Sequence, residues 1–400
     1  MGLFSATERI NALDRKSIAF TEGRCLHSTD KYIECDACYD ICPINAIEHG
    51  KPPNFEEETC QSCLACIPVC PTGAYSSEDA VPALVKTAAR HDSTTIELAC
   101  EVHLNLDEGP TNSETVIKVR GCLAGIGTGG YFLLFALGKE KIISRLDSCQ
   151  DCPWGKLQTQ IQSQVDQTNS YLSAWDMEGR VEVIKNIEEI QMHERPVWDA
   201  QNPPLSRRDL FRFASERSKT LVARAIHPGG GDRNIRRPSP NHLRMIAAIE
   251  QLPEIQKDNL NISGFASISV SEECCACGAC ERVCPTKAIK FTLNNFKTFS
   301  LKLQVDHCVG CKICQHICIS EAITIDQIPT FKSVFGNSEL LALQGGDITR
   351  CERCNVIIAK KPNVFLCPVC EERIKNPFSA VFPDRLKQLI EIRADNEKKS

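Results

Sequence analysis

Cysteine is the residue type whose number and spacing could do chemistry in this sequence. The chain contains 25 cysteines in 400 residues, and most of them stand three or four positions from another cysteine. Short fixed spacings of this kind are typical of metal or redox sites rather than of disulfides, which an odd number of cysteines also fits poorly. The sequence therefore predicts that bound metal supplies the chemistry of this protein.

One cysteine pattern occurs four times along the chain. Its copies start at Cys35, Cys60, Cys274 and Cys308, and the last three read Cys-x2-Cys-x2-Cys-x3-Cys. A Cys-x2-Cys-x2-Cys loop brings three sulfurs from one tight turn to three irons of a cubane cluster, and the fourth ligand comes from elsewhere. We therefore expect two pairs of iron–sulfur clusters.

These strings resemble the bacterial dicluster ferredoxins, in which the last cysteine of each run, usually followed by proline, ligates the partner cluster. Three of the four runs carry that proline, and Ile319 takes its place after Cys318. By position, the resemblance implies four 4Fe-4S clusters with the ligand sets Cys25, Cys35, Cys38 and Cys70; Cys42, Cys60, Cys63 and Cys66; Cys274, Cys277, Cys280 and Cys318; and Cys284, Cys308, Cys311 and Cys314.

The first ligand set departs from the ferredoxin pattern. Its leading cysteine would stand where the chain has Tyr32, and the nearest thiol upstream is Cys25. We expect Cys25 to be the missing ligand, reached through a longer loop; a three-iron cluster and a corner ligated by water are the alternatives. Cys275 is out of phase with the second array and is interpreted as a small apolar residue.

Three apolar, β-rich runs of the central region each lead into cysteine. The runs and their cysteines are 95–99 with Cys100, 116–121 with Cys122, and 142–148 with Cys149 and Cys152. Helix-compatible segments separate the runs, which predicts an α/β domain with parallel strands. Ligands bind beyond the carboxyl ends of such strands, so we expect the four thiols to converge on one site.

The order of these central cysteines is similar to that in the delta subunit of methyl-viologen-reducing hydrogenases. That resemblance implies a further cluster, of two-iron type in that family, which relays electrons between a hydrogenase and a heterodisulfide reductase. From the residues themselves, a 2Fe-2S or 4Fe-4S cluster, a zinc ion held by four thiolates and plain packing all stay open. We predict a central iron–sulfur cluster held by Cys100, Cys122, Cys149 and Cys152.

A competing motif overlaps the central cysteines. Gly125, Gly127 and Gly130 satisfy the G-x-G-x-x-G pattern of dinucleotide sites between a strand and a helix, and Asp147 stands about where a ribose-binding acid would. Nicotinamide or flavin binding is therefore the rival prediction for this domain. His103, three residues after Cys100, is interpreted as a surface or core histidine rather than a ligand.

Two further cysteine pairs stand near the carboxyl end of the sequence. Cys351 and Cys354 are separated by two residues, as are Cys367 and Cys370, and twelve residues lie between the pairs. This spacing is typical of the two knuckles of a zinc ribbon, in which four thiolates surround one ion. We predict structural zinc there, with rubredoxin-like iron as the rival.

The cysteine groups divide the chain into five predicted parts. The expected fold is multidomain, α/β and α+β, with two dicluster ferredoxin-like modules flanking a parallel α/β domain and a zinc-ribbon-like unit at the C-terminus. The boundaries are 1–80 for the first ferredoxin module, 81–195 for the central domain, 196–265 for a linker with helical segments, 266–330 for the second ferredoxin module, and 331–400 for the ribbon and a helical tail.

Composition limits the partners and the compartment. The net charge of −5 gives no electrostatic footprint for nucleic acid. The uncharged run 121–138 is rich in glycine and predicts a buried helix rather than a membrane span. The first 24 residues carry charges throughout and lack the apolar stretch of a secretory signal, so we expect a cytoplasmic protein.

The expected function is that of an iron–sulfur electron-transfer subunit of anaerobic metabolism. It would relay electrons between partner oxidoreductase subunits such as a hydrogenase, a dehydrogenase or a heterodisulfide-reductase-like complex. No residue set for catalysis stands out, so whether the chain is itself an enzyme stays open, with a non-catalytic subunit favoured. A nicotinamide- or flavin-linked oxidoreductase and a metal storage or maturation scaffold are the alternatives.

Overall fold

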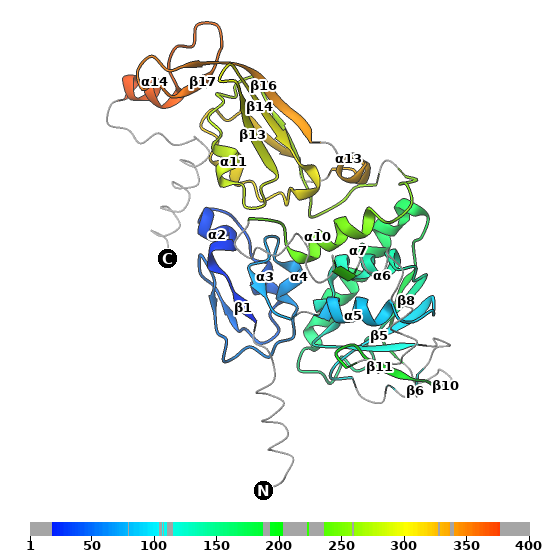
Figure 1. Ribbon diagram of the computed structural model, residues 1–400. Coiled ribbons are helices and arrows are strands. Elements are labelled where there is room, and N and C mark those ends of the chain that lie inside the picture. The colour runs from blue at the N-terminus through cyan, green and yellow to red at the C-terminus, as the bar shows by residue number, and fades with distance from the viewer. Residues whose placement is uncertain are drawn as a thin grey trace. The chain divides into compact units, whose positions relative to one another are not determined.

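The computed structural model describes residues 18–78, 80–103, 106, 108–109, 115–186, 193–202, 222–223, 236–257, 260–326, 329–336 and 340–376 (Figure 1). The predicted helical tail and residues 203–221 and 224–235 of the predicted linker lie outside these residues. The chain forms two compact units. The first comprises Met1–Cys25, Asp36–Ile235 and Ser239–Lys257, and the second comprises Leu26–Cys35, Arg236–Pro238 and Asp258–Ser400.

A five-stranded parallel sheet forms the centre of the first unit. Its strands run in the order β11-β7-β5-β8-β9, and each neighbouring pair is parallel, as predicted for the central domain. The strands are β5 (Thr95–Cys100), β7 (Val116–Val119), β8 (Lys141–Arg145), β9 (Val181–Ile184) and β11 (Val197–Asp199). The last of these lies in the segment predicted as a linker and extends one edge of the sheet.

Helices pack on this sheet and on one another. Among the described residues, the helices around this sheet are α5 (Ala80–Ala88), α6 (Gly127–Ala136), α7 (Gln158–Leu172) and α10 (Pro240–Ile249). Every residue of α6 is buried, and the helix packs against α5, α7 and α10. The uncharged run of the sequence is therefore an internal helix. Over the described residues, no helix has the length and apolar character that crossing a bilayer requires.

The N-terminal cysteine array folds into a small module of the first unit. Antiparallel pairing joins β1 to β4 and β2 to β3. The elements follow the order β1 (Ala19–Phe20), α3 (Ala37–Ile41), β2 (Ile47–Glu48), β3 (Asn54–Phe55), α4 (Cys66–Val69) and β4 (Tyr75–Ser76). Such short elements bury little apolar surface, so loops and their ligands must carry much of the module's stability.

The second array repeats this order of elements in the second unit. Antiparallel pairing joins β12 to β15 and β13 to β14. The elements are β12 (Ser267–Val270), α11 (Ala279–Val283), β13 (Ile289–Asn294), β14 (Thr298–Leu303), α12 (Ile313–His316) and β15 (Ile323–Asp326). The two modules therefore share one topology, which the sequence repeat predicts.

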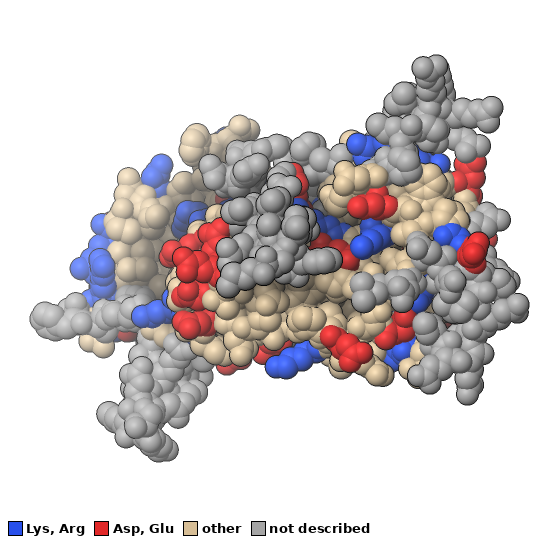
Figure 2. Space-filling view, turned by 90° about the horizontal axis from the view of Figure 1, so that it is seen from below, with Lys and Arg blue, Asp and Glu red and all other residues tan. Residues whose placement is uncertain are grey.

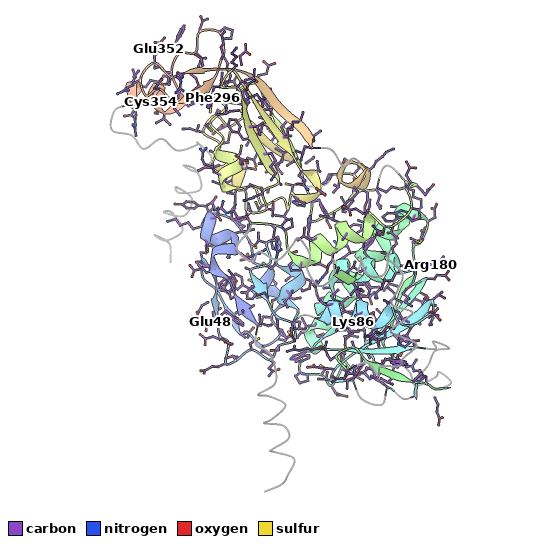
Figure 3. All side chains as sticks on the ribbon, in the orientation of Figure 1. Glu48, Lys86, Arg180, Phe296, Glu352 and Cys354 are labelled. Carbon is purple, nitrogen blue, oxygen red and sulfur yellow. The ribbon has the colours of Figure 1, made fainter. Side chains whose placement is uncertain are left out.

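The C-terminal cysteine pairs belong to a sheet that also includes the second module. This sheet has the strand order β13-β14-β16-β17. One end of β16 (Leu341–Arg350) pairs with β14, and its last three residues pair with β17 (Ile357–Ala359). Helices α13 (Phe331–Phe335) and α14 (Pro368–Lys375) precede and follow these strands. In Figure 3, Phe296 marks the turn between β13 and β14, and Cys354 marks the cysteine unit.

The remaining elements are short. They are α2 (Leu26–Thr29), the antiparallel pair β6 (Glu108–Gly109) and β10 (His193–Glu194), and the 3-10 turns η1 (Glu22–Arg24), η2 (Leu123–Gly125), η3 (Gly155–Leu157), η4 (Ser173–Trp175) and η5 (Val305–His307). Figure 2 shows basic and acidic side chains among uncharged ones on the face in view.

Candidate iron–sulfur and metal centres

The ferredoxin-type cysteine loops share one backbone geometry. In the loops that start at Cys60, Cys274 and Cys308, the residues on either side of the second cysteine have positive φ angles. These residues are Ser62 (54°), Leu64 (69°), Ala276 (57°), Gly278 (65°), Gly310 (65°) and Lys312 (63°). The left-handed conformation costs residues other than glycine about 1–2 kcal/mol and persists where its surroundings impose it. It winds each loop tightly, as binding of one cluster by three sulfurs requires.

A second shared feature follows the last cysteine of each run. The residue three positions later has a positive φ in all four copies: Asn45, Gly73, Lys287 and Glu321. In the N-terminal module, the next backbone N–H donates to the sulfur, from Ala46 to Cys42 Sγ at 3.3 Å and from Ala74 to Cys70 Sγ at 3.2 Å. Such donation stabilises the thiolate form that a metal binds.

Within the N-terminal module, several cysteine sulfurs lie close enough to act on one another electrostatically. Burial raises the pKa of Cys63 to about 11, and the sulfurs of Cys42 and Cys60 add to this effect. Burial also raises the pKa of Cys66 well above its usual value, with Cys42, Cys60 and Cys63 among the neighbouring charges. Cys42, the last cysteine of the first run, therefore lies close enough to Cys63 and Cys66 to act on both, and its ligand role stays a prediction.

Cys25, the predicted ligand outside the regular pattern, lies near Cys38. Burial raises the pKa of Cys38 to about 11, and the sulfurs of Cys70 and Cys25 contribute to the shift. Cys25 thus lies close enough to Cys38 to act on it electrostatically, as its predicted role requires. Cys35 belongs to the segment that groups with the second unit, and it stays a predicted ligand.

The second module contains two hollows, each lined by one of the predicted ligand sets. One is lined by Cys274, Cys277, Cys280 and Cys318, together with Cys275. The other is lined by Cys284, Cys308, Cys311 and Cys314. Burial raises the pKa of Cys280 and of Cys311 to about 12. Buried thiols with raised pKa values stay neutral unless a cation replaces their protons, so both hollows fit a thiolate-bound iron cluster.

The four central cysteines also converge. Cys100 is the last residue of β5, and Cys122 follows β7 and precedes η2. Burial raises the pKa of Cys149 to about 12, and the sulfurs of Cys100 and Cys152 add to it. Burial likewise raises the pKa of Cys122, with Cys100 and Cys149 among its neighbours. The structure thus places these thiols beyond the carboxyl ends of β5, β7 and β8.

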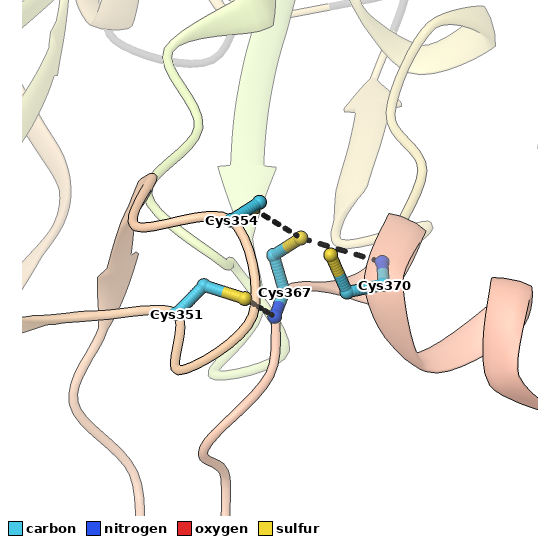
Figure 4. Close-up of side chains that lie close together, drawn as sticks. All are labelled: Cys351, Cys354, Cys367 and Cys370. Carbon is cyan, nitrogen blue, oxygen red and sulfur yellow. Dashed lines mark hydrogen bonds between the residues drawn. The ribbon is translucent and has the colours of Figure 1, made fainter.

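The C-terminal cysteines form a narrower group (Figure 4). The sulfurs of Cys351, Cys354, Cys367 and Cys370 all lie within 4.8 Å of one another, and those of Cys354 and Cys367 are 3.7 Å apart. The backbone N–H of Cys367 donates to Cys351 Sγ at 3.3 Å, and that of Cys370 donates to Cys367 Sγ at 3.4 Å. A zinc–sulfur bond of about 2.3 Å in a tetrahedron separates sulfurs by about 3.8 Å, so this group fits one ion.

Comparison with known proteins bears on the two ferredoxin-type arrays. Residues 33–74 and 273–322 match the family described as 4Fe-4S dicluster domain. Pyruvate synthase subunit PorD of Methanocaldococcus jannaschii is 30% identical over 68 residues, which are 16% of this chain and 79% of that protein. The chain belongs to the 4Fe-4S dicluster ferredoxins. Its dicluster domains give it an iron–sulfur, ferredoxin-like electron-transfer function and imply bound 4Fe-4S clusters.

Two ferredoxins are similar to the dicluster domains over shorter lengths. The ferredoxin of Alicyclobacillus acidocaldarius subsp. acidocaldarius is 39% identical over 46 residues, 11% of this chain and 59% of that protein. Ferredoxin 7Fe of Hydrogenibacillus schlegelii is 36% identical over 47 residues, 12% of this chain and 60% of that protein. The chain therefore spans less than two thirds of the length of these two ferredoxins. No solved structure matches the chain.

Sequence reasoning missed one polar feature of the dicluster domains. A hydroxyl stands two residues after the last cysteine in three of the four runs and lies near its sulfur. The distances are 3.8 Å for Thr72 Oγ1 to Cys70 Sγ, 3.6 Å for Thr286 Oγ1 to Cys284 Sγ, and 3.7 Å for Ser320 Oγ to Cys318 Sγ. Hydrogen bonds to ligand sulfurs are one of the ways in which a protein sets a cluster's potential. The repeated Cys-x-Thr/Ser spacing is the signal that could have found it.

The glycine-rich motif of this dicluster ferredoxin packs two helices together. The N–H of Gly129 donates to Asn241 Oδ1 of α10 at 2.8 Å. A Cβ atom on Gly127 would lie 2.4 Å from the same Oδ1, and one on Gly129 would lie 2.1 Å from the Asn241 carbonyl oxygen. The amino end of α6 is thus occupied by α10, where a dinucleotide would need its pyrophosphate. This packing argues against the nicotinamide or flavin alternative.

Asp147, the candidate ribose-binding acid, is held by other side chains. Arg145 donates to its two carboxylate oxygens at 2.6 and 2.8 Å, and His103 Nε2 lies 3.2 Å from Oδ2. Although burial raises it, these contacts bring the pKa of Asp147 well below its usual value. His103 therefore pairs with a carboxylate beside the central cysteines, in agreement with its interpretation as a non-ligand.

Proposed function

We propose that this protein is a multi-cluster electron-transfer subunit that relays electrons between partner oxidoreductase subunits. The observation that carries the proposal is the repeated grouping of buried thiols within each dicluster domain, including the exchange of the last cysteine between runs. When bound, the clusters accept and donate single electrons. The protein's own residues bury the ligand sulfurs, position them and donate hydrogen bonds to them.

The proposed ligand sets are those implied by the ferredoxin pattern. The electrostatic neighbours of Cys38, Cys63 and Cys66 support the N-terminal sets, and the two cysteine-lined hollows support the others. For the first set, Cys25 is the proposed fourth ligand, together with Cys35, Cys38 and Cys70. A three-iron cluster is the alternative for that set, and the name of Ferredoxin 7Fe gives seven irons for one relative.

For the central site we propose a cluster held by Cys100, Cys122, Cys149 and Cys152. Among the described residues, the C-terminal cysteines form a group whose sulfurs all lie within 4.8 Å of one another, and the central cysteines do not form such a group. The central sulfurs are more widely spaced than one tetrahedral ion prefers, since such an ion separates sulfurs by about 3.8 Å. This spacing favours a 2Fe-2S or 4Fe-4S cluster over zinc at the centre, and single structural zinc at the C-terminal unit.

The proposed partners are the other subunits of an oxidoreductase complex, such as a hydrogenase, a dehydrogenase or a heterodisulfide-reductase-like enzyme. The relative from Methanocaldococcus jannaschii is by name a subunit of pyruvate synthase. A protein with several clusters can accept electrons at one and pass them on from another, so this chain would connect two partners. Its clusters would transfer electrons, and the chemical conversion would take place on the partners.

Anaerobic purification followed by metal and sulfide analysis tests the proposal. We expect four iron atoms for each of four clusters, two or four more for the central site, and one zinc. The clusters should be reduced and reoxidised repeatedly without release of iron. Release of iron or sulfide to an acceptor protein on each cycle would instead support the storage or maturation scaffold, and bleaching of the clusters by NADH would support the nicotinamide-linked enzyme.

A further inference from the structure

The central cysteine site contacts the N-terminal dicluster domain through a ligand residue on each side. The backbone N–H of Cys122 donates to the backbone carbonyl of Cys63 at 3.1 Å. Cys63 is the second cysteine of its loop, and Cys122 follows β7. The sulfur of Cys63 is also among the charges that act on Cys122. One hydrogen bond therefore joins two proposed ligand sets.

A second contact links the same two loops. The indole N–H of Trp154 donates to Gln61 Oε1 at 2.9 Å. Gln61 directly follows Cys60, and Trp154 stands two residues after Cys152, to whose sulfur its backbone N–H donates at 3.4 Å. Trp154 is buried, with 5% of the residue exposed, so this hydrogen bond lies in the interior of the first unit.

Glycines make this close approach possible. Gly121 has a φ of 69°, and a Cβ atom there would lie 3.0 Å from Leu64 Cδ1 and 3.1 Å from the Cys63 carbonyl oxygen. A Cβ atom on Gly125 would lie 2.9 Å from the Cβ of Leu64. Leu64 itself is completely buried. The loop of the central domain thus lies directly against the cysteine loop of the dicluster domain.

We infer that the Cys63–Cys122 contact is the electron-transfer connection between the second N-terminal cluster and the central cluster. The path runs from Cys63 Sγ through its Cβ, Cα and carbonyl group, crosses the hydrogen bond to the Cys122 N–H, and continues through Cα and Cβ to Cys122 Sγ. With clusters bound at both sites, a single electron would pass along this path from the reduced cluster to the oxidised one, and no bond would form or break. The central domain is thereby the entry or exit point of the N-terminal dicluster domain.

This inference rests on the proposed function, because it requires clusters at both sites. Contacts made for packing alone could join any residues of the two loops. Here the backbone bond joins two proposed ligand cysteines, and the side-chain bond joins Gln61, directly after Cys60, to Trp154, two residues after Cys152. Two reduced clusters held this close interact magnetically, and the interaction falls steeply as they move apart.

Electron paramagnetic resonance of the reduced full-length protein tests the inference. In the unchanged protein, we expect the signal of the central cluster to be broadened and fast-relaxing. Cys60→Ser, which removes a proposed ligand of the second N-terminal cluster, should narrow that signal and make it saturate at lower microwave power. Cys275→Ser, at a cysteine with no predicted ligand role, is the control and should leave the signal unchanged.

A second variant retains every cysteine. Gly125→Ala places a methyl group against Leu64, so Leu64 and the adjoining Cys63 carbonyl must shift, and we expect weaker magnetic interaction at unchanged iron content. Unchanged relaxation of the central signal in both variants would overturn the inference. Iron content that does not fall in Cys149→Ser would instead refute the central cluster, and with it the proposed function of that domain.

Discussion

Arg145 and Glu97 form an ion pair in which both side chains are buried. Arg145 Nη1 lies 2.8 Å from Glu97 Oε1, and the side chains are 1% and 0% exposed. Arg145 also binds Asp147, and Arg195 donates to the other side of Glu97. Glu97 belongs to β5 and Arg145 to the neighbouring strand β8. The two arginines and the two carboxylates neutralise one another's charges inside the domain.

Removal of the Arg145 charge should destabilise the first unit strongly. Arg145→Met leaves Glu97 with one partner and Asp147 without its main one, and loss of one member of a buried pair costs about 3–5 kcal/mol. The three tryptophans, Trp154, Trp175 and Trp198, all belong to this unit, so denaturant unfolding followed by tryptophan fluorescence measures the change.

The matched control for Arg145 is an exposed pair on the same sheet. Lys141 Nζ lies 2.8 Å from Glu182 Oε1, with the side chains 41% and 50% exposed. Because solvent screens such a pair, Lys141→Ala should cost about 0–1 kcal/mol. Equal effects of the two substitutions would contradict a structural role for the buried network.

The contact between α6 and α10 predicts that a glycine-to-alanine substitution in α6 lowers the stability of the protein, although the same change usually stabilises a helix. Gly129→Ala in a free helix would stabilise it by about 1 kcal/mol. Here the added Cβ would meet the Asn241 backbone oxygen, so we expect destabilisation of about 1–3 kcal/mol or more from overpacking. Gly23→Ala meets open space in the same unit and serves as the control. A thermal melt in which Gly129→Ala gains stability would disprove the close packing.

Cys25 is the predicted ligand that can be tested most directly. The sulfur of Cys25 lies near that of Cys38, so we propose that both bind the same cluster. Cys25→Ala should therefore remove that cluster, or one iron atom if a three-iron cluster survives. Iron and sulfide analysis of the anaerobically purified chain measures this. Cys275→Ala should retain all iron. If Cys25→Ala retains all iron as well, Cys25 is not a ligand.

Removal of the C-terminal metal should affect that unit while the iron clusters stay bound. Cys354→Ser removes one of the four sulfurs and should lower zinc content without lowering iron, since metal binding and folding are coupled in such small units. Limited proteolysis within residues 341–376 should become faster. The site would be a rubredoxin-like iron centre if the unchanged protein contains no zinc and if Cys354→Ser loses iron together with a red colour.

The parallel central sheet and the two dicluster domains could be predicted because they depend on local patterns. Apolar runs followed by cysteine specify both the strand and the position of the thiol at its end, as in β5 with Cys100. Side-chain contacts between residues that are distant in the sequence could not be predicted. Asp30 Oδ2 lies 3.2 Å from His316 Nδ1, and Asn241 fills the glycine-rich turn of α6, yet neither residue belongs to a recognisable motif.

Strand pairing across the predicted domain boundaries could not be predicted from the sequence either. β11 joins the parallel sheet from within the predicted linker, and β16 pairs with β14 of the second dicluster domain. Three residues of β11 carry too little periodicity to indicate a strand, and register between distant strands is set by the complete sheet rather than by either sequence alone.

The course of β16 has a consequence for how this protein can be divided. Since β16 pairs with β14 and also with β17 beside the C-terminal cysteines, a chain shortened after Gly336 would leave the N–H and C=O groups of β14 available to other molecules. Such a fragment should self-associate even with its iron in place. We therefore expect β13 and β14 to give a soluble protein only when they are expressed together with β16 and β17.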